Sequence, residues 1–121
     1  KMALDIVYKD VPQAIKRGDD IALVFDGIVD STGSDVNLST GYTAKLQVRN
    51  DPDDTSAIIS LTESAGLTLE KGKVTATITS TASATYTFDS AHYELEVTSD
   101  TGGEVKTIRG GAIKLVKDYC R

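Results

Sequence analysis

The sequence is poor in several residue types: among 121 residues it has one cysteine, one histidine, two prolines and no tryptophan. Cys120 alone excludes an intrachain disulfide, on which small secreted domains usually depend. We therefore expect a chain that matures in a reducing cytosol, or one large enough to fold without a bridge. Cys120 is then a tolerated thiol, with an intermolecular bridge as the alternative. So few histidines and cysteines also exclude a zinc site.

Long apolar runs and clustered basic residues are missing as well. No apolar run approaches the roughly 20 residues of a membrane helix, and the N-terminus lacks the apolar segment of a signal peptide. The formal net charge is −5, with Lys and Arg scattered along the sequence, whereas phosphate binding needs them clustered. We therefore expect no export and neither membrane nor nucleic acid as a partner. The composition, 40% hydrophobic and 26% charged, and the length predict one globular domain over residues 1–121.

Helical patterning is nearly absent, whereas alternation with a period of two residues is common. Only Ser80 to Tyr86, a run of small residues, predicts a single helical turn or a loose crossover. From Tyr42 to Arg49 apolar and polar residues alternate strictly, which predicts a strand with one buried and one exposed face. The same pattern recurs from Val74 to Ile78 and from Tyr93 to Val97.

Further segments predict strands without clear alternation. Ile21 to Phe25 is almost continuously apolar, so we expect it to be covered on both faces or to lie centrally in a sheet. Val105 to Val116 contains Gly110-Gly111, and the apolar residues before and after this pair are out of phase, which predicts a β-bulge or bend there. The other two candidates are Leu4 to Tyr8 and Ala57 to Thr62. With turn signals between the runs, the pattern predicts an all-β fold, an immunoglobulin-like antiparallel β-sandwich of roughly seven to eight strands.

The residues offer little support for catalysis. The sequence contains no Gly-rich phosphate loop and no Gly-x-Ser-x-Gly nucleophile elbow. His92 stands at the head of an alternating strand on its solvent side, and we expect an exposed strand residue rather than a general base. Asp51, Asp53 and Asp54 cluster in one turn without the ligand spacing of a calcium loop, which predicts a solvated turn. We expect no enzyme activity, no metal, no cofactor and no small-molecule ligand.

A more specific pattern begins at Asn37-Leu38-Ser39-Thr40-Gly41-Tyr42-Thr43, directly before the first alternating strand. Later elements follow in order, up to a Gly102-Gly103 hairpin and the strand Gly110-Gly111-Ala112-Ile113-Lys114-Leu115. Over about residues 18–119, this order resembles the N-terminal domain family of phage baseplate upper proteins and related small tail and capsid accessory proteins. The resemblance implies an immunoglobulin-like sandwich that builds part of a virion and catalyses nothing.

From this resemblance we expect a structural component of a phage tail, baseplate or head, assembled in the host cytoplasm and located in the virion. Its partners are then other virion proteins and further copies of the chain in a homo-oligomer. An adhesion or carbohydrate-binding module is the main alternative, although the sequence has few of the aromatic rings on which sugars stack. A small hydrolase is a third, since catalytic carboxylates carry no local motif. The candidate subunit-contact residues lie in two loops and are Ser31, Asp35, Asp51, Asp53, Asp54 and Thr55.

Overall fold

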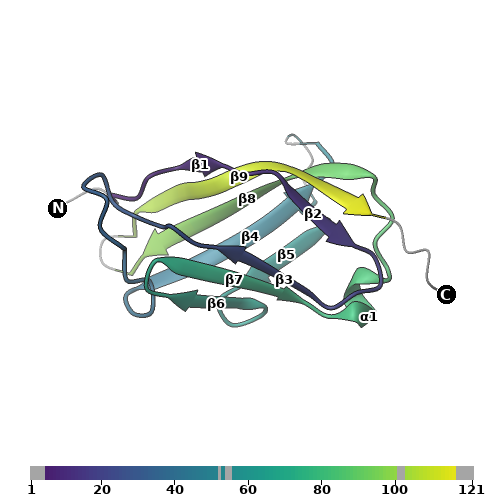
Figure 1. Ribbon diagram of the computed structural model, residues 1–121, viewed down its shortest axis with the longest axis horizontal. Helices are drawn as coiled ribbons and strands as arrows, with labels where there is room; N and C mark the ends of the chain where they lie inside the picture. Colours follow the sequence, from purple (N-terminus) through teal and green to yellow (C-terminus); the bar gives the residue numbers. More distant parts are fainter. Residues whose placement is uncertain (1–4, 52, 54–55, 101–102, 117–121) are drawn as a thin grey trace.

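The computed structural model describes residues 5–51, 53, 56–100 and 103–116, which form two β-sheets packed face to face (Figure 1). The strands of the larger sheet are β1 (Lys9–Asp10), β2 (Gln13–Lys16), β4 (Tyr42–Arg49), β5 (Ile59–Thr62), β8 (Ser90–Ser99) and β9 (Val105–Val116). Those of the smaller sheet are β3 (Ile21–Phe25), β6 (Leu67–Glu70) and β7 (Lys73–Ile78). The strand orders are β1-β9-β8-β4-β5, with β2 also pairing β9, and β3-β7-β6. The predicted all-β class is confirmed.

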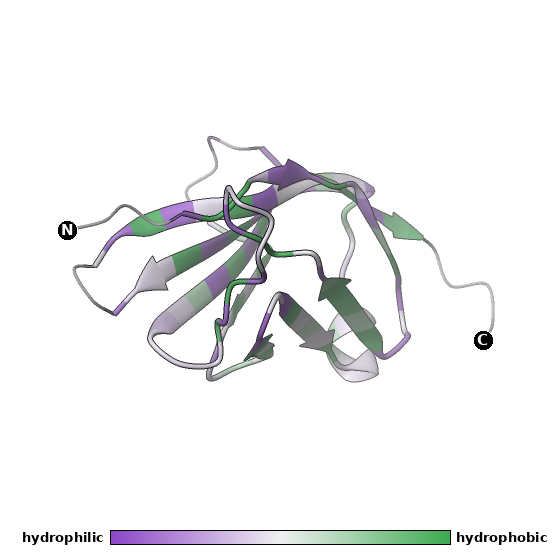
Figure 2. Ribbon diagram, turned by 60° about the vertical axis from the view of Figure 1, so that its left-hand side comes forward, coloured by the Kyte–Doolittle hydropathy of each residue, from purple (hydrophilic) through white to green (hydrophobic). Residues whose placement is uncertain are grey.

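Alternation along the strands builds one core between the sheets. β4, β7 and β8 bury every second residue, as the period of two predicted. Figure 2 shows this alternation as hydrophobic and hydrophilic bands along the strands of the larger sheet. The rings of Phe25 on β3 and Tyr93 on β8 meet across the core, with centroids 5.7 Å apart. Buried apolar side chains from both sheets therefore form a single cluster.

The prediction that Ile21 to Phe25 is covered on both faces or central in its sheet is wrong. β3 lies at the edge of the smaller sheet, with β7 as its only strand neighbour among the described residues. Its residues alternate between buried and exposed, and Val24, on the side of the smaller sheet turned away from the core, is 50% exposed. Folded proteins tolerate single exposed apolar side chains, so a continuous apolar run can still have one face in water.

β9 contains the predicted bulge, but the bulge lies just before the glycine pair. Leu95 and Glu96 of β8 pair with residues of β9 that are two positions apart, which leaves Ile108 as the extra residue. As a result both Ile108 and Arg109 face the interior, where they are 0% and 2% exposed. The bulge also restores the phase, so that Ile113 reaches the core.

The N-terminal part departs most from the prediction. Leu4 lies outside the described residues, residues 5–8 form no strand, and pairing begins at Lys9. β1 and β2 run parallel to β9, so the larger sheet is mixed and not purely antiparallel. The sequence pattern did not predict β2 or β6. The described residues contain nine strands in all. The immunoglobulin-like assignment stays a prediction.

The predicted helical turn is confirmed as α1 (Ser80–Ser83), which connects β7 and β8. The side chain of Thr79 caps it by accepting a hydrogen bond from the backbone N–H of Ala82. Ser83 is fully buried: its hydroxyl donates to the carbonyl of Asp19 at 2.7 Å and accepts from the N–H of Gly18 at 3.0 Å. α1 therefore holds the turn between β2 and β3 in place.

Candidate functional site

The outer face of the larger sheet, which is turned away from the core, contains a hollow of about 430 Å³. We call this surface the outer face. The floor of the hollow is formed by Gly110 and Gly111 of β9, and its walls come from β4, β8 and the segment around β1. The walls carry Tyr8, Asp10, Lys45, Gln47, Arg49, His92, Glu94 and Glu96.

The hollow exists because β9 has no side chain at its centre. Gly110 pairs with Glu94 on one neighbouring strand and with Asp10 on the other. A Cβ atom at Gly110 would lie 2.8 Å from the Oη of Tyr8, so the tyrosine ring uses the space that a side chain would need. Tyr8 remains 46% exposed there. The hollow therefore combines an exposed aromatic ring with three carboxylates, those of Asp10, Glu94 and Glu96.

Charges on the outer face are sorted by strand. The outward positions of β4 include Lys45 and Arg49, which we call the basic strip. The outward positions of the adjacent β8 include Glu94 and Glu96, which we call the acidic strip. Arg49 donates to the side-chain oxygen of Gln47, at 3.0 and 3.3 Å from its two terminal nitrogens. Within the described part of the chain, Lys45, Glu94 and Glu96 form no ion pair, so their charges face solvent.

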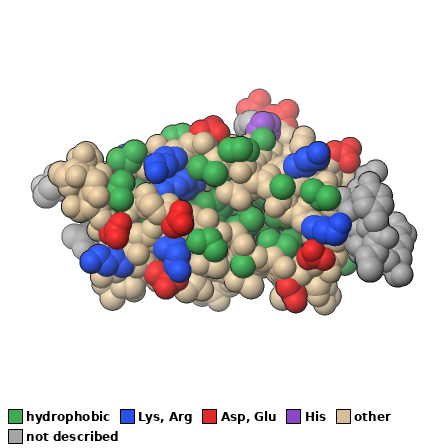
Figure 3. All heavy atoms as spheres, viewed as in Figure 1, with side chains coloured by type: hydrophobic (Ala, Val, Ile, Leu, Met, Phe, Trp, Pro, Cys, Tyr) green, Lys and Arg blue, Asp and Glu red, His purple; other side chains and the backbone are tan. Residues whose placement is uncertain are grey.

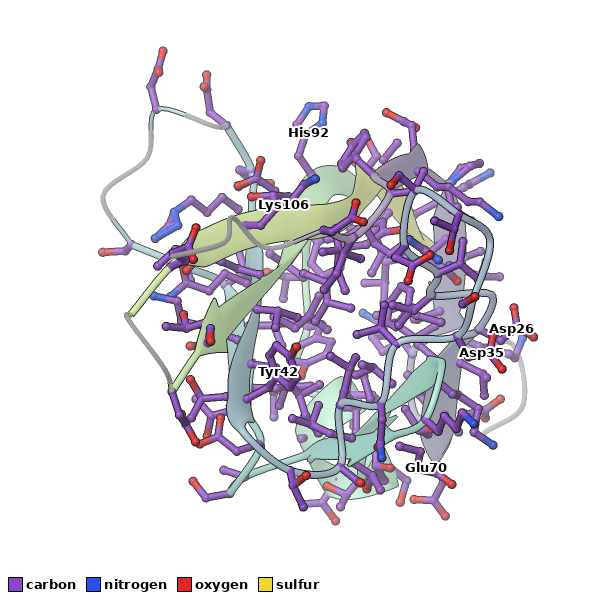
Figure 4. The ribbon with its side chains drawn as sticks, turned by 90° about the vertical axis from the view of Figure 1, so that its left-hand side faces the viewer. Asp26, Asp35, Tyr42, Glu70, His92 and Lys106 are labelled. Atoms are coloured by element: carbon purple, nitrogen blue, oxygen red, sulfur yellow. The ribbon has the colours of Figure 1, made fainter. Side chains whose placement is uncertain are left out.

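His92 is exposed on the outer face, on the strand side that the alternation predicted. In Figure 4 it points away from the interior, whereas Tyr42 lies between the sheets. Its register partner on β4 is Arg49, and no described side chain shares a hydrogen bond with its imidazole. His92 therefore contributes a polar rim to the hollow.

Arg109 ties the two sheets together beneath this surface. One terminal nitrogen donates to the carbonyls of Val7 at 3.2 Å and Ile108 at 2.8 Å. The other donates to the carbonyls of Asp26 at 3.0 Å and Gly27 at 3.1 Å. Loss of water around the guanidinium lowers the pKa of Arg109, but an arginine stays charged. The side chain thus holds the segment before β1 against the loop after β3.

A second exposed surface lies where the sandwich is open, between β3 and the β1–β2 segment. We call it the open side. A crevice of about 140 Å³ there is lined in part by Val11, Val24 and Phe25. Figure 3 shows hydrophobic side chains gathered in the middle of this view and charged side chains toward both ends. Because β3 has a strand neighbour on one side only within the described part of the chain, its other backbone edge can pair with an added strand.

The structure describes four of the six predicted contact residues and places them in two separate loops. Ser31 and Asp35 lie in the loop before β4, whereas Asp51 and Asp53 lie in the loop after it, at the opposite end of that strand. All four are exposed. The remaining two candidates lie outside the described residues and are Asp54 and Thr55.

Asp30 orders the first of these loops. Its Oδ1 atom accepts hydrogen bonds from the hydroxyl and the backbone N–H of Thr32 and from the backbone N–H of Ser34. These bonds, the one from the Thr32 hydroxyl first, lower the pKa of the Asp30 carboxyl below its usual 3.8. Nearby, the hydroxyl and N–H of Ser31 donate to the carboxylate of Asp5 at 2.9 and 3.2 Å. Ser31 is thus engaged within the chain.

The second loop shows a local turn contact. Asp51 accepts a hydrogen bond from the N–H of Asp53, with 3.0 Å between Oδ1 and N. Among the residues that the structure describes, no group of three or more His, Cys, Asp and Glu side chains could hold a metal ion. The helix in the described ranges is too short and too polar to cross a membrane.

The sequence reasoning missed the hollow and the contributions of Tyr8 and Asp10 to it. Gly110-Gly111-Ala112 within a predicted strand was the available signal, because small residues in a strand leave space above it. What the sequence could not show was that β1 pairs with β9 beside this gap. The fold and the surface define a β-sandwich with a hollow on the outer face and an edge strand on the open side. The chain matches no protein-family model and no curated protein.

Proposed function

We propose that the chain is a non-catalytic structural component of a phage particle, in the tail, baseplate or head, and that it works through protein–protein contacts. The observation that carries this proposal is the open side. There the edge strand β3 lacks a second strand neighbour in the described structure and exposes half of Val24. An uncovered edge with an apolar side chain is a template for main-chain pairing with a partner.

The sequence resemblance to phage baseplate and accessory proteins supports the same function. Its implied all-β architecture agrees with the observed two-sheet fold. Pairing through a sheet edge also suits assembly, because a particle sums many copies of a modest contact into a stable whole. The partner class is therefore another virion protein that presents an extended segment to β3.

The experiment uses the virion proteins encoded beside the gene. Each is purified and its affinity for the chain is measured by biolayer interferometry, and purified particles are searched for the chain by mass spectrometry. We expect one of these proteins to bind and the chain to occur in particles at a stoichiometric level. Absence from particles together with no binding to any of these proteins contradicts the proposal.

A substitution on β3 locates the contact. Val24→Lys places a charge on the uncovered edge strand, and edge lysines oppose strand addition. We expect it to weaken binding at least about tenfold, in line with the loss of a central interface contact. Thr68→Lys is the matched control, because Thr68 is exposed on β6 at the other edge of the same sheet. Equal losses from both variants would place the contact elsewhere.

The exposed ring of Tyr8 favours a second candidate, a carbohydrate-binding module. Sugars stack on exposed aromatic rings, and Asp10, Gln47 and Glu94 beside the ring can accept or donate hydrogen bonds to hydroxyls. Binding on a glycan array that is lost in Tyr8→Ala and kept in Val24→Lys would support this candidate. A silent array removes it.

A further inference from the structure

The outer face has a charge pattern that fits a second copy of itself. The basic strip on β4 and the acidic strip on β8 lie on neighbouring strands, and Lys45 stands opposite Glu96 in register. Adjacent strands are about 4.8 Å apart, so two parallel bands of opposite sign lie side by side. Any partner that covers this face must meet both signs.

Symmetry then decides how two copies can meet. In a twofold face-to-face pair, an axis running along the strands between β4 and β8 places the basic strip of each copy over the acidic strip of the other. An axis across the strands instead places basic over basic and acidic over acidic, which is repulsive. We infer that the chain self-associates through the outer face about a twofold axis that runs along β4 and β8.

Two exposed apolar groups on the same face add to this contact. Tyr8 is 46% exposed beside the floor glycines, and Val105, which stands opposite Thr98 at the end of β9, is 57% exposed. Tyrosine is enriched among the residues that contribute most to binding at interfaces, and covering either group removes apolar surface from water. The hollow over Gly110 also leaves room for a long basic side chain from the other copy, next to Glu94 and Asp10.

The size of the face predicts a weak dimer. Four adjacent strands with the eight-residue length of β4 span on the order of 500 Å² per copy. Two copies together then bury about 1,000 Å², the lower end for specific interfaces. A contact of this size that depends on exposed charges dissociates on dilution and weakens as salt rises.

This inference identifies a second copy of the chain as one of its protein partners, and it therefore rests on the proposed function in protein–protein contacts. The two can fail separately, because self-association is measured on the purified chain alone and uses the outer face. Incorporation into particles is measured with other proteins and uses the open side around Val24.

Charge reversal and mixing test the dimer by sedimentation equilibrium with a reductant present. Lys45→Glu/Arg49→Glu makes both strips acidic, and Glu94→Lys/Glu96→Lys makes both basic. We expect each double variant to raise the dissociation constant at least about tenfold. An equimolar mixture of the two restores opposite charges at both contacts, and we expect its affinity to return to within about threefold of the wild type.

A matched control separates the effect of the two charged strips on association from the effect of net charge. Lys71→Glu/Lys73→Glu changes the net charge as much as the first double variant does, and both of its residues lie outside the outer face. We expect wild-type affinity. A wild-type chain that stays monomeric at millimolar concentration, a mixture that stays monomeric, or a control that weakens association equally overturns the inference.

One measurement needs no substituted protein and so does not depend on any variant folding. On dilution of the wild type, we expect NMR shift changes to concentrate at Lys45, Glu94, Glu96 and Tyr8. Changes concentrated at Val24 and its neighbours instead assign the contact to the open side and overturn the inference.

Discussion

Two adjacent glycines of β9 have different reasons to be glycine. Gly111 has a φ of +143°, and a Cβ there would lie 3.0 Å from the carbonyl oxygen of Val11. The φ of Gly110 is not positive, and its added Cβ would meet only the end of the half-exposed Tyr8 side chain at less than 3 Å. A side chain at Gly111 would be strained by the backbone conformation and crowded by backbone atoms that cannot move aside. A side chain at Gly110 would meet only an exposed ring, which can turn away.

We therefore predict that Gly111→Ala lowers the free energy of unfolding by about 2–3 kcal/mol and Gly110→Ala by less than about 1 kcal/mol. Urea unfolding of the two variants under identical conditions measures the difference. Gly110→Ala should also change the NMR shifts of the Tyr8 ring, which Gly111→Ala leaves nearer their wild-type values. Equal losses of stability would contradict the different roles assigned to the two glycines.

At the scale of elements, the short helix α1 holds the turn between β2 and β3 in place through hydrogen bonds. Ser83 is its only fully buried side chain, and its hydroxyl bridges Gly18 and Asp19 in the turn between β2 and β3. Removing the hydroxyl leaves the N–H of Gly18 and the carbonyl of Asp19, whose hydrogen bonds to it are partly buried, without this partner, although alanine itself favours a helix.

We predict that Ser83→Ala destabilises the chain by about 1–3 kcal/mol. The effect should be local first: the amide of Gly18 should exchange with deuterium faster, while amides at the centre of β8 keep their order of protection. Thr81→Ala is the control, because Thr81 is exposed on the same helix, and we expect a change within about 0.5 kcal/mol. A control that matches Ser83→Ala would show that helix propensity, not the hydroxyl, is responsible.

The strands that could be predicted from the sequence are those with one wet and one buried face. Tyr42 to Arg49 is such a case, because polar side chains at every second position indicate which face of the strand meets water. β3 lacks this alternation of polar and apolar residues, since its outward residues Ala22 and Val24 are apolar. Its position at the edge of the sheet could therefore not be predicted from the sequence. The need for a bulge in β9 followed from phase, but its position at Ile108 depends on the inward hydrogen bonds of Arg109.

Less of the candidate site could be predicted, because it depends on pairing between distant segments. The alternation placed Lys45, His92 and Glu94 on outward positions correctly. The parallel pairing of β1 with β9 brings Asp10 beside Gly110, across a separation of about a hundred residues. No local pattern specifies such a pair, since parallel register is fixed by the connections and the core.

At the scale of the whole molecule, the two sheets share one core, and this determines how the chain unfolds. The cluster of buried apolar side chains is contiguous across both sheets, and Phe25 and Tyr93 contact each other between them. Leu95, in the central strand of the larger sheet, is completely buried within that cluster. Neither sheet can therefore lose its partner without exposing its own apolar face to water.

We predict that Leu95→Ala lowers the free energy of unfolding by about 3–5 kcal/mol, through lost burial and the cavity left behind. Hydrogen exchange should show the slowest amides of β8 and of β7 losing protection by the same amount, because both exchange through one global unfolding event. Thr77→Ala, exposed on β7, should leave both sets nearly unchanged. Amides of β7 that keep wild-type protection in Leu95→Ala would mean that the smaller sheet unfolds independently, and the shared core would then not couple the two layers.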